Sequence, residues 1–314
     1  MCGIIANVGH GQLTIENIFT GLTRLVYRGY DSCGIAFINK DKLEIFKTTG
    51  GVDELEEKVN SADYKGVDIA IGHTRWATHG EPSELNSHPH SSQDGSIVIV
   101  HNGIIENYSA LKKMLEQNGY IFKTETDTEV MANLISFLQK EQGGHITSVV
   151  KNAMNHIVGA CAFVVVSESE PDKLVAVTMG SPLVLGKATF GYFIASDESA
   201  FVGIAPEKRE MKDGEIITLT STTCEIESIS GEMVDPKFVL ITRTLEEIEK
   251  GNFAHFMLKE IFEQPETIAR ALKGRSGRVN KSENKLILGG IKSVAKSLKK
   301  AEQFVFLACG TSYN

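Results

Sequence analysis

The chain has 314 residues, of which 42% are hydrophobic and 23% are charged, and its formal net charge is −8. This composition is ordinary for a globular protein and excludes a disordered, collagenous or low-complexity chain. The acidic balance argues against a nucleic-acid partner, because binding nucleic acid requires an excess of Lys and Arg to neutralise phosphates. The length lies just beyond that of a single core, so we expect one large domain and part of another.

No apolar run approaches the roughly 18 residues of a membrane span, and the N-terminus lacks the pattern of a secretory signal. We therefore expect no membrane partner. The five Cys include no CxxC pair, which favours a reducing compartment over a disulfide framework or a zinc site. His88 and His90 are the only close pair of His, and no Cys lies near them to complete a zinc site. The sequence thus predicts a cytoplasmic protein that holds no metal and no other cofactor.

The spacing of apolar residues predicts the elements of the first domain. In chain order they are a helix at 15–26, hairpin strands at 34–38 and 43–46, strands at 68–72 and 96–101, helices with apolar faces at 111–115, 130–138 and 146–157, and strands at 160–167, 173–178, 192–195, 215–219 and 224–229. Strands and helices come in blocks and do not strictly alternate. This order favours an α+β fold of stacked antiparallel sheets with helices outside over a doubly wound parallel sheet.

A different pattern begins where the first domain, 2–230, closes near 231–236. Helices are expected at 245–249 and 254–272, and a basic stretch at 273–285 is interpreted as solvated linker. We assign 231–289 to this linker. A helix at 290–300 and an apolar strand at 303–308, which runs into a Gly-Thr-Ser turn, then predict the truncated start of a second domain at 290–314.

The first candidate catalytic residue is Cys2, which directly follows the initiator Met. Removal of Met1 would leave a thiol and a free α-amine on one residue. The pKa of such an amine is about 7.7–8.0, so near neutral pH a fraction of it is unprotonated and can act as the base for the thiol. Cys2 could instead be a small buried residue at the start of the first strand, as free Cys often are.

A second motif, at 73–82, stands where a strand is expected to end. Arg75 offers a rigid, bidentate partner for a carboxylate. Trp76, in a segment bounded by Gly and Pro, would suit a loop that folds over a small ligand and excludes water. The alternative is a surface loop in which Arg75 forms an ion pair and the Trp76 side chain packs into the hydrophobic core.

Two further motifs each have a structural and a catalytic interpretation. Asn102 followed by Gly103 is a strong hairpin signal, but the Gly N–H and the Asn amide could also form an oxyanion hole. The helical pattern that begins at Glu106 weakens the hairpin interpretation. Thr126 and Glu129 form a plausible capping box before a helix, whereas the carboxylate of Asp127 could pair with the ammonium of an amino acid.

Together the four motifs supply a nucleophile, a carboxylate partner, oxyanion donors and an ammonium partner, which are the parts needed to hydrolyse the side-chain amide of a free amino acid. They resemble the glutaminase half of the glutamine–fructose-6-phosphate aminotransferase family, the class II glutamine amidotransferases that make glucosamine 6-phosphate. The segments that carry the resemblance are 1–4, 27–32, 73–83, 86–89, 101–107 and 125–130, and segments 255–265 and 309–313 are similar to the family's linker and to the opening of its sugar isomerase (SIS) half.

The resemblance implies a four-layer αββα sandwich of the N-terminal-nucleophile hydrolase type, followed by a helical linker and the first strand of a truncated αβα sugar isomerase domain. It implies L-glutamine as the substrate, Cys2 as the nucleophile with its freed amine as the base, and an oxyanion hole of Asn102 and Gly103. The residues implied for the substrate pocket are Arg75, Trp76, Thr78, His79 and Asp127, with Arg28 and Tyr30 lining or supporting it. Thr311 and Ser312 resemble the start of a phosphate-binding loop.

In a full-length enzyme of this family the released ammonia would convert fructose 6-phosphate into glucosamine 6-phosphate, and the enzyme would be a homo-oligomer. From this chain we expect the glutaminase reaction only. The alternatives are the glutaminase domain of another class II amidotransferase, such as an amidophosphoribosyltransferase, and a non-catalytic fragment that binds a sugar phosphate. A general amidase would not need both Arg75 and Asp127, which together select a free amino acid.

Overall fold

The computed structural model describes residues 2–10, 14–29, 31–62, 66–76, 81–249, 251–272, 276–280, 283–286, 294–305 and 307. The chain forms two compact units, of which the first ends at Glu249. That boundary lies beyond the predicted domain end at residue 230. The main reason is that β14 (Val239–Leu240) pairs with β11 (Glu207–Glu210) at the edge of a sheet and so ties the following segment to the first unit.

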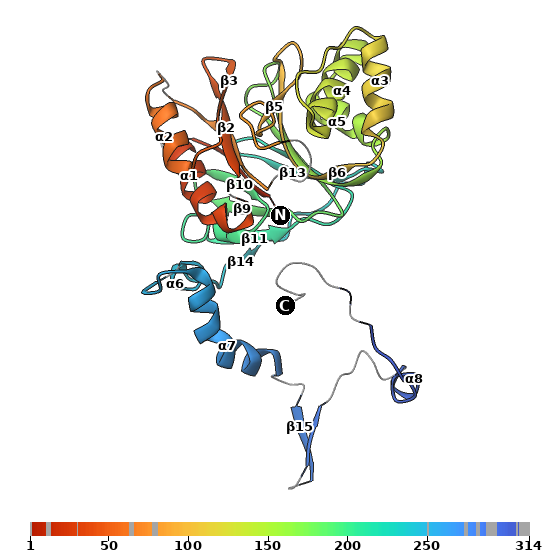
Figure 1. The fold of residues 1–314 in the computed structure, drawn as a ribbon. Coiled ribbons are helices and arrows are strands. Elements are labelled where there is room, and N and C mark those ends of the chain that lie inside the picture. The colour runs from red at the N-terminus through yellow and green to blue at the C-terminus, as the bar shows by residue number, and fades with distance from the viewer. Residues whose placement is uncertain are drawn as a thin grey trace. The chain divides into compact units, whose positions relative to one another are not determined.

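Two antiparallel sheets form the centre of the first unit (Figure 1). One contains, in spatial order, β14, β11, β9 (Val184–Ala188), β10 (Gly191–Ala195), β1 (Gly3–Gly9), β4 (Ile69–Arg75), β2 (Ser32–Asn39) and β3 (Lys42–Thr48). The other contains β13 (Cys224–Ser228), β12 (Glu215–Leu219), β8 (Leu174–Met179), β7 (Gly159–Ser167), β6 (Ile97–Ile105) and β5 (His90–Ser91). All the ladders between these strands are antiparallel, which confirms the expected sheet type.

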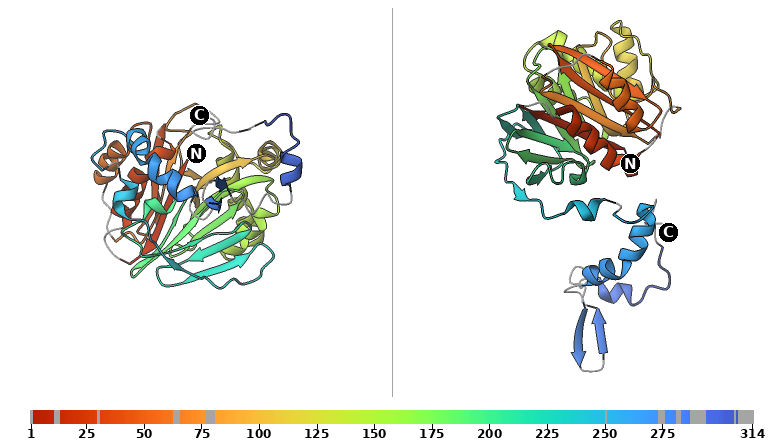
Figure 2. Two further views of the ribbon diagram at one scale, coloured as in Figure 1. Left: turned by 90° about the horizontal axis from the view of Figure 1, so that it is seen from below. Right: turned by 90° about the vertical axis from the view of Figure 1, so that its left-hand side faces the viewer.

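Helices cover the outer face of each sheet, as Figures 1 and 2 show. Helices α1 (Thr14–Leu25) and α2 (Val52–Asn60) pack on the eight-stranded sheet, and α3 (Tyr108–Gln117), α4 (Asp127–Gln142) and α5 (Ile146–Met154) cover the six-stranded one. One cluster of buried apolar side chains lies under each helical layer, and a third lies between the sheets. The first unit is therefore an α+β protein with four layers, helix–sheet–sheet–helix.

Local sequence explains several of these elements. Lys40 and Asp41 adopt left-handed backbone conformations, with φ of 51° and 64°, in the tight turn between β2 and β3, and such a turn matches the twist of the paired strands. In the middle of the six-stranded sheet, β7 is almost continuously apolar, because a strand covered on both faces buries both sets of its side chains.

Some predicted boundaries were wrong. Strand β6 does not end at His101 but continues through Asn102 and Gly103 to Ile105, because it pairs with β7 along its whole length. Asn102 and Gly103 are therefore not a hairpin turn. Helix α2 was not predicted, although its buried Val52, Leu55 and Val59 have helical spacing. Strand β11 was missed because its residues are all charged, and only its place in the sheet makes it a strand.

The rest of the chain holds few elements. The first unit also contains two short turns of 3₁₀ helix, η1 (Val26–Arg28) and η2 (Glu198–Ala200), and helix α6 (Leu245–Ile248). The second unit contains helices α7 (Phe256–Leu272) and α8 (Ala295–Leu298). Strands β15 (Ser276–Asn280) and β16 (Glu283–Leu286) pair as a hairpin within the basic stretch, whose assignment as linker stays a prediction.

The apolar strand expected at 303–308 is not formed at 303–305 or at 307, the described residues of that stretch. No described strand lies alongside to accept and donate the hydrogen bonds that a strand requires. Thr311 and Ser312 lie outside the described residues, so the assignment of 290–314 to an isomerase domain stays a prediction. In the described part of the chain, none of the helices is both long and apolar enough to traverse a bilayer.

Candidate active site

The motifs predicted to carry chemistry meet around one small cavity of about 50 Å³. Among the residues that line it are Cys2, Arg75, Trp76, Asn102, Gly103 and Asp127, all predicted from the sequence. Cys2 directly precedes β1, and Arg75 is the last residue of β4, directly followed by Trp76. Asn102 and Gly103 lie in the second half of β6, and Asp127 begins α4. Tyr30, Thr78 and His79 lie outside the described residues, and for them the pocket assignment stays a prediction.

Cys2 is placed by the pairing of β1 with β4, in which Gly3 lies opposite Thr74. Its Sγ accepts a hydrogen bond from the Trp76 N–H at 3.2 Å. Burial raises the pKa of the Cys2 thiol above its usual range, although this N–H and the nearby Arg75 act in the opposite direction. The thiol is therefore protonated at neutral pH, and it needs a base to become a nucleophile.

The main chain of Cys2 is held by two side chains. Its carbonyl oxygen accepts hydrogen bonds from Asn102 Nδ2 at 3.0 Å and from Arg28 Nε at 3.2 Å. Arg28 also forms an ion pair with Asp197, with 3.9 Å between Nη1 and Oδ2. Arg28 is not among the residues that line the cavity, so what the structure shows is a supporting contact to the backbone of the candidate nucleophile.

Gly103 has a conformation that only glycine adopts readily, with φ of 132°. A Cβ built at this position would lie 2.0 Å from the carbonyl oxygen of Ala160 on the neighbouring strand β7. The absence of a side chain thus lets β6 stay paired with β7 while its backbone borders the cavity. Asn102 and Gly103 therefore line the cavity together with Cys2, although they are not the turn that the dipeptide favours.

Opposite charges face the cavity from two elements. Arg75, only 4% exposed, stands at the end of β4, and burial lowers the pKa of its guanidinium while the Asp127 carboxylate acts in the opposite direction. A guanidinium remains protonated at neutral pH even so. Asp127 begins helix α4, and its Oδ2 accepts a hydrogen bond from the Ile105 N–H at 2.8 Å. This arrangement is suited to a zwitterion, whose carboxylate and ammonium need one partner of each sign.

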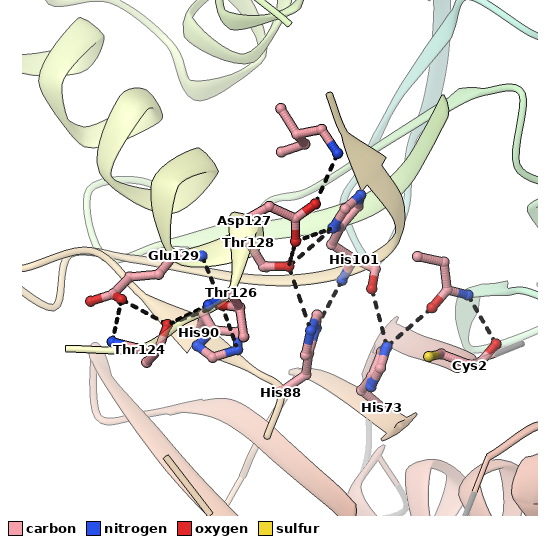
Figure 3. A network of polar contacts seen from close by, with 12 residues as sticks. Cys2, His73, His88, His90, His101, Thr124, Thr126, Asp127, Thr128 and Glu129 are labelled. Atoms are coloured by element: carbon pink, nitrogen blue, oxygen red, sulfur yellow. Dashed lines mark hydrogen bonds and ion pairs between the residues drawn. The ribbon is translucent and has the colours of Figure 1, made fainter. Parts of the chain in front are cut away.

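A cluster of four buried imidazoles adjoins these residues (Figure 3), and two of its members, His88 and His101, line the cavity themselves. The sequence motifs gave none of the four a catalytic role. The ring of His88 stacks on that of His73 with 4.1 Å between centroids, and it meets the ring of His90 edge-on at 4.7 Å. His101 Nδ1 lies 3.0 Å from Thr128 Oγ1. The sequence gave one indication of their location: each of the four His belongs to a motif segment or lies next to one, which places all four near the site.

These imidazoles are neutral at pH 7. Burial lowers the pKa of His73 to about 3 and holds the pKa values of His88, His90 and His101 below their usual range. Within the described ranges, no group of three or more His, Cys, Asp or Glu side chains is arranged to hold a metal ion. What the structure shows is a set of hydrogen-bond donors and acceptors that fix the residues lining the cavity.

Comparisons with known proteins agree with this geometry. Residues 73–203 match the family model of a glutamine amidotransferase domain. Over 317 residues the chain is 42% identical to the glutamine–fructose-6-phosphate aminotransferase (isomerizing) of Chlorobaculum tepidum, and over 314 residues it is 41% identical to that of Aquifex aeolicus. Each alignment covers 100% of this chain but only 51% and 50% of the relative, so the chain spans about half the length of the curated relatives it matches.

A solved structure is similar as well. The glutamine phosphoribosylpyrophosphate amidotransferase of B. subtilis, complexed with ADP and GMP, superposes with a TM-score of 0.62 at 30% sequence identity. The match covers 74% of this chain and 50% of that one.

Proposed function

This chain belongs to the glutamine amidotransferase family that includes the glutamine–fructose-6-phosphate aminotransferases, and we propose that it hydrolyses L-glutamine to glutamate and ammonia through a thioester on Cys2. The observation that supports the proposal is the convergence of Cys2, Arg75, Asn102, Gly103 and Asp127 on one cavity. The αββα layering and the superposition on a related amidotransferase support assignment to the N-terminal-nucleophile type of hydrolase.

The two charged residues select a free amino acid. Arg75 binds the α-carboxylate of glutamine and Asp127 binds its α-ammonium, which leaves the side-chain amide directed at the nucleophile. Trp76 is 45% exposed and donates its N–H to the Cys2 thiol, and its assignment to a loop that closes over the substrate rests on the resemblance. Thr78, His79 and Tyr30 are assigned to the same pocket on the resemblance alone.

The reaction is acyl transfer to a thiol. Once Met1 has been removed, the α-amine of Cys2 takes the proton of its own thiol, and the thiolate attacks the amide carbon. The negative charge on the amide oxygen is stabilised by the Asn102 amide and the Gly103 N–H. The α-ammonium of Cys2 returns its proton to the leaving nitrogen of the glutamine amide, and ammonia departs. Water then hydrolyses the thioester to release glutamate.

A wider activity is proposed from the relatives. In a protein that also carries a sugar isomerase half, the ammonia would convert fructose 6-phosphate into glucosamine 6-phosphate, in a cytoplasmic homo-oligomer. Residues 290–314, with Thr311 and Ser312 as phosphate ligands, would begin that half. The alignment along the entire chain at about 40% identity favours this acceptor over phosphoribosylpyrophosphate, whose enzyme matches 74% of the chain at 30% identity.

The test is to measure glutamate release and to treat the protein with a glutamine-analogue chloroketone, followed by peptide mapping. We expect the adduct on Cys2 and no activity in Cys2→Ala. Cys33→Ala is the matched control, because Cys33 is also a thiol near the start of a strand but does not line the cavity. Parent-level activity in Cys2→Ala, or an adduct on Cys33, would show that the assignment is wrong.

A further inference from the structure

The side chain of Asn102 can support catalysis in only one of its two orientations. A primary amide presents an oxygen on one side and an NH2 group on the other, and only the NH2 group can donate to a developing oxyanion. Rotation by 180° about the terminal torsion would direct the oxygen, a hydrogen-bond acceptor, at the same place. Some neighbouring group must therefore decide which end of the amide faces Cys2.

Two groups do so: the Cys2 carbonyl oxygen, which accepts from Asn102 Nδ2, and His73, which holds the other end of the amide. The Nε2 of His73 lies 3.2 Å from the backbone carbonyl oxygen of His101 and 3.1 Å from Asn102 Oδ1. A carbonyl oxygen only accepts, so Nε2 must carry the proton. An Nε2–H donor can pair only with the oxygen of the Asn102 amide. The NH2 group is then turned away from His73 and toward Cys2, whose carbonyl oxygen accepts from it at 3.0 Å.

The imidazole of His73 is itself held in one orientation. It is fully buried and stacks nearly parallel on the ring of His88, at an interplanar angle of 14°. His88 is fixed in turn, because its Nδ1 accepts from the His101 N–H at 3.3 Å and its Nε2 lies 3.5 Å from Thr128 Oγ1. The low pKa of His73, caused by burial, keeps the ring neutral across the neutral pH range.

The contact also joins the two sheets. His73 lies on β4 of the eight-stranded sheet, opposite Ile4 of β1, whereas Asn102 lies on β6 of the six-stranded sheet, opposite Ala162 of β7. The hydrogen bond between them therefore sets the position of an oxyanion donor on one sheet relative to the nucleophile at the start of β1 on the other.

We propose that His73 is a positioning residue for amide hydrolysis, which acts by holding the NH2 group of Asn102 toward the Cys2 nucleophile through the Nε2–H···Oδ1 hydrogen bond between the sheets. The proposal rests on the proposed function, because it assigns a role within glutamine hydrolysis. It predicts an effect on kcat and not on substrate binding, since Arg75 and Asp127 bind the amino acid.

The first experiment compares three substitutions at His73 by steady-state kinetics with L-glutamine. His73→Leu removes the donor, and we expect kcat to fall roughly 100- to 1,000-fold, the range for loss of an oxyanion-hole donor, with KM within about threefold of the parent value. His73→Gln can place an amide N–H close to the Nε2 position and should recover most of kcat. His73→Asn places its amide nitrogen nearer the Nδ1 position and should not.

A double-mutant cycle then separates positioning from general damage to the fold. If His73 acts through Asn102, His73→Leu should lower kcat in the parent but produce almost no further loss in Asn102→Ala. His90→Leu is the matched control, because His90 belongs to the same buried cluster but contacts Thr126 and not Asn102. Any loss that it causes should multiply with that of Asn102→Ala.

Three results would overturn the proposal. They are an unchanged kcat in folded His73→Leu, equal kcat in the Gln and Asn variants, and the same loss from His73→Leu in both backgrounds. If His73→Leu does not fold, the comparison of Gln with Asn decides. Failure of the proposed function is distinguished from all of these, because the parent protein would then neither release glutamate nor take up the chloroketone on Cys2.

Discussion

Replacing Gly103 by Ala should destabilise the protein far more than an ordinary glycine substitution. The backbone of Gly103 has φ of 132°, and a Cβ there would lie 2.0 Å from the carbonyl oxygen and 2.9 Å from the carbonyl carbon of Ala160. Both atoms belong to the backbone of β7, which pairs with β6 from Ile97 to Ile105. The contact cannot be relieved by rotating a side chain, so one of the two strands must move.

The expected cost has two parts. Holding a residue other than glycine at this φ costs about 1–3 kcal/mol, and forcing an extra methyl group into a packed site costs about another 1–3 kcal/mol. We therefore expect the free energy of unfolding to fall by about 4 kcal/mol. Gly95→Ala is the control, because Gly95 has φ of 77° and a Cβ added there would meet no atom within 4 Å. It should show the conformational cost alone, about 1–2 kcal/mol.

Urea unfolding followed by circular dichroism measures both variants. With a slope of about 3 kcal/mol per molar urea, the upper part of the usual range, the midpoint should fall by about 1.3 M for Gly103→Ala. For Gly95→Ala the expected fall is about 0.5 M. Equal midpoints for the two variants would refute the reasoning, because the contact with β7 would then contribute nothing.

Three further predictions concern ionisable groups that are buried or partly buried. Burial lowers the pKa of Lys47 to about 8, so the charged ammonium opposes folding below pH 8, and this penalty fades as the pH rises to 10.5. Lys47→Met should therefore raise the free energy of unfolding at pH 7 by up to about 3 kcal/mol. Equal urea midpoints for the parent and the variant would contradict this. Burial keeps His88 neutral in the folded state, so stability should be lost as the pH falls below about 6.5; His88→Phe should reduce that slope, measured from urea midpoints between pH 5 and 8, by up to about 1.4 kcal/mol per pH unit. The carboxylate of Glu215 accepts hydrogen bonds from both terminal nitrogens of buried Arg209, at 2.7 and 2.6 Å. Glu215→Gln should therefore lower the free energy of unfolding by about 3–5 kcal/mol at pH 7 in the same assay. A fall of less than about 1 kcal/mol would contradict the assigned role of this ion pair.

Much of the fold follows from local patterns. The helical spacing of apolar residues predicts α1 and α4, and the polar stretch between two apolar segments predicts the hairpin of β2 and β3. Elements without such a pattern were missed. Strand β11 is wholly charged and exists because β9 and β14 offer it hydrogen-bond partners. The strand expected at 303–308 shows the converse, since its described residues, 303–305 and 307, have no described partner strand and do not form one.

The candidate site divides in the same way. Residue type, order along the chain and the family resemblance were enough to predict Cys2, Arg75, Asn102 and Asp127 as a candidate nucleophile, cation, amide donor and anion, because these are properties of the side chains themselves. Their gathering around one cavity, the route of β6 through Gly103, and the hydrogen bond between His73 and the Asn102 amide were decided only by the tertiary structure. They depend on strand register and on the packing of one sheet against the other, which arise between segments far apart in the sequence.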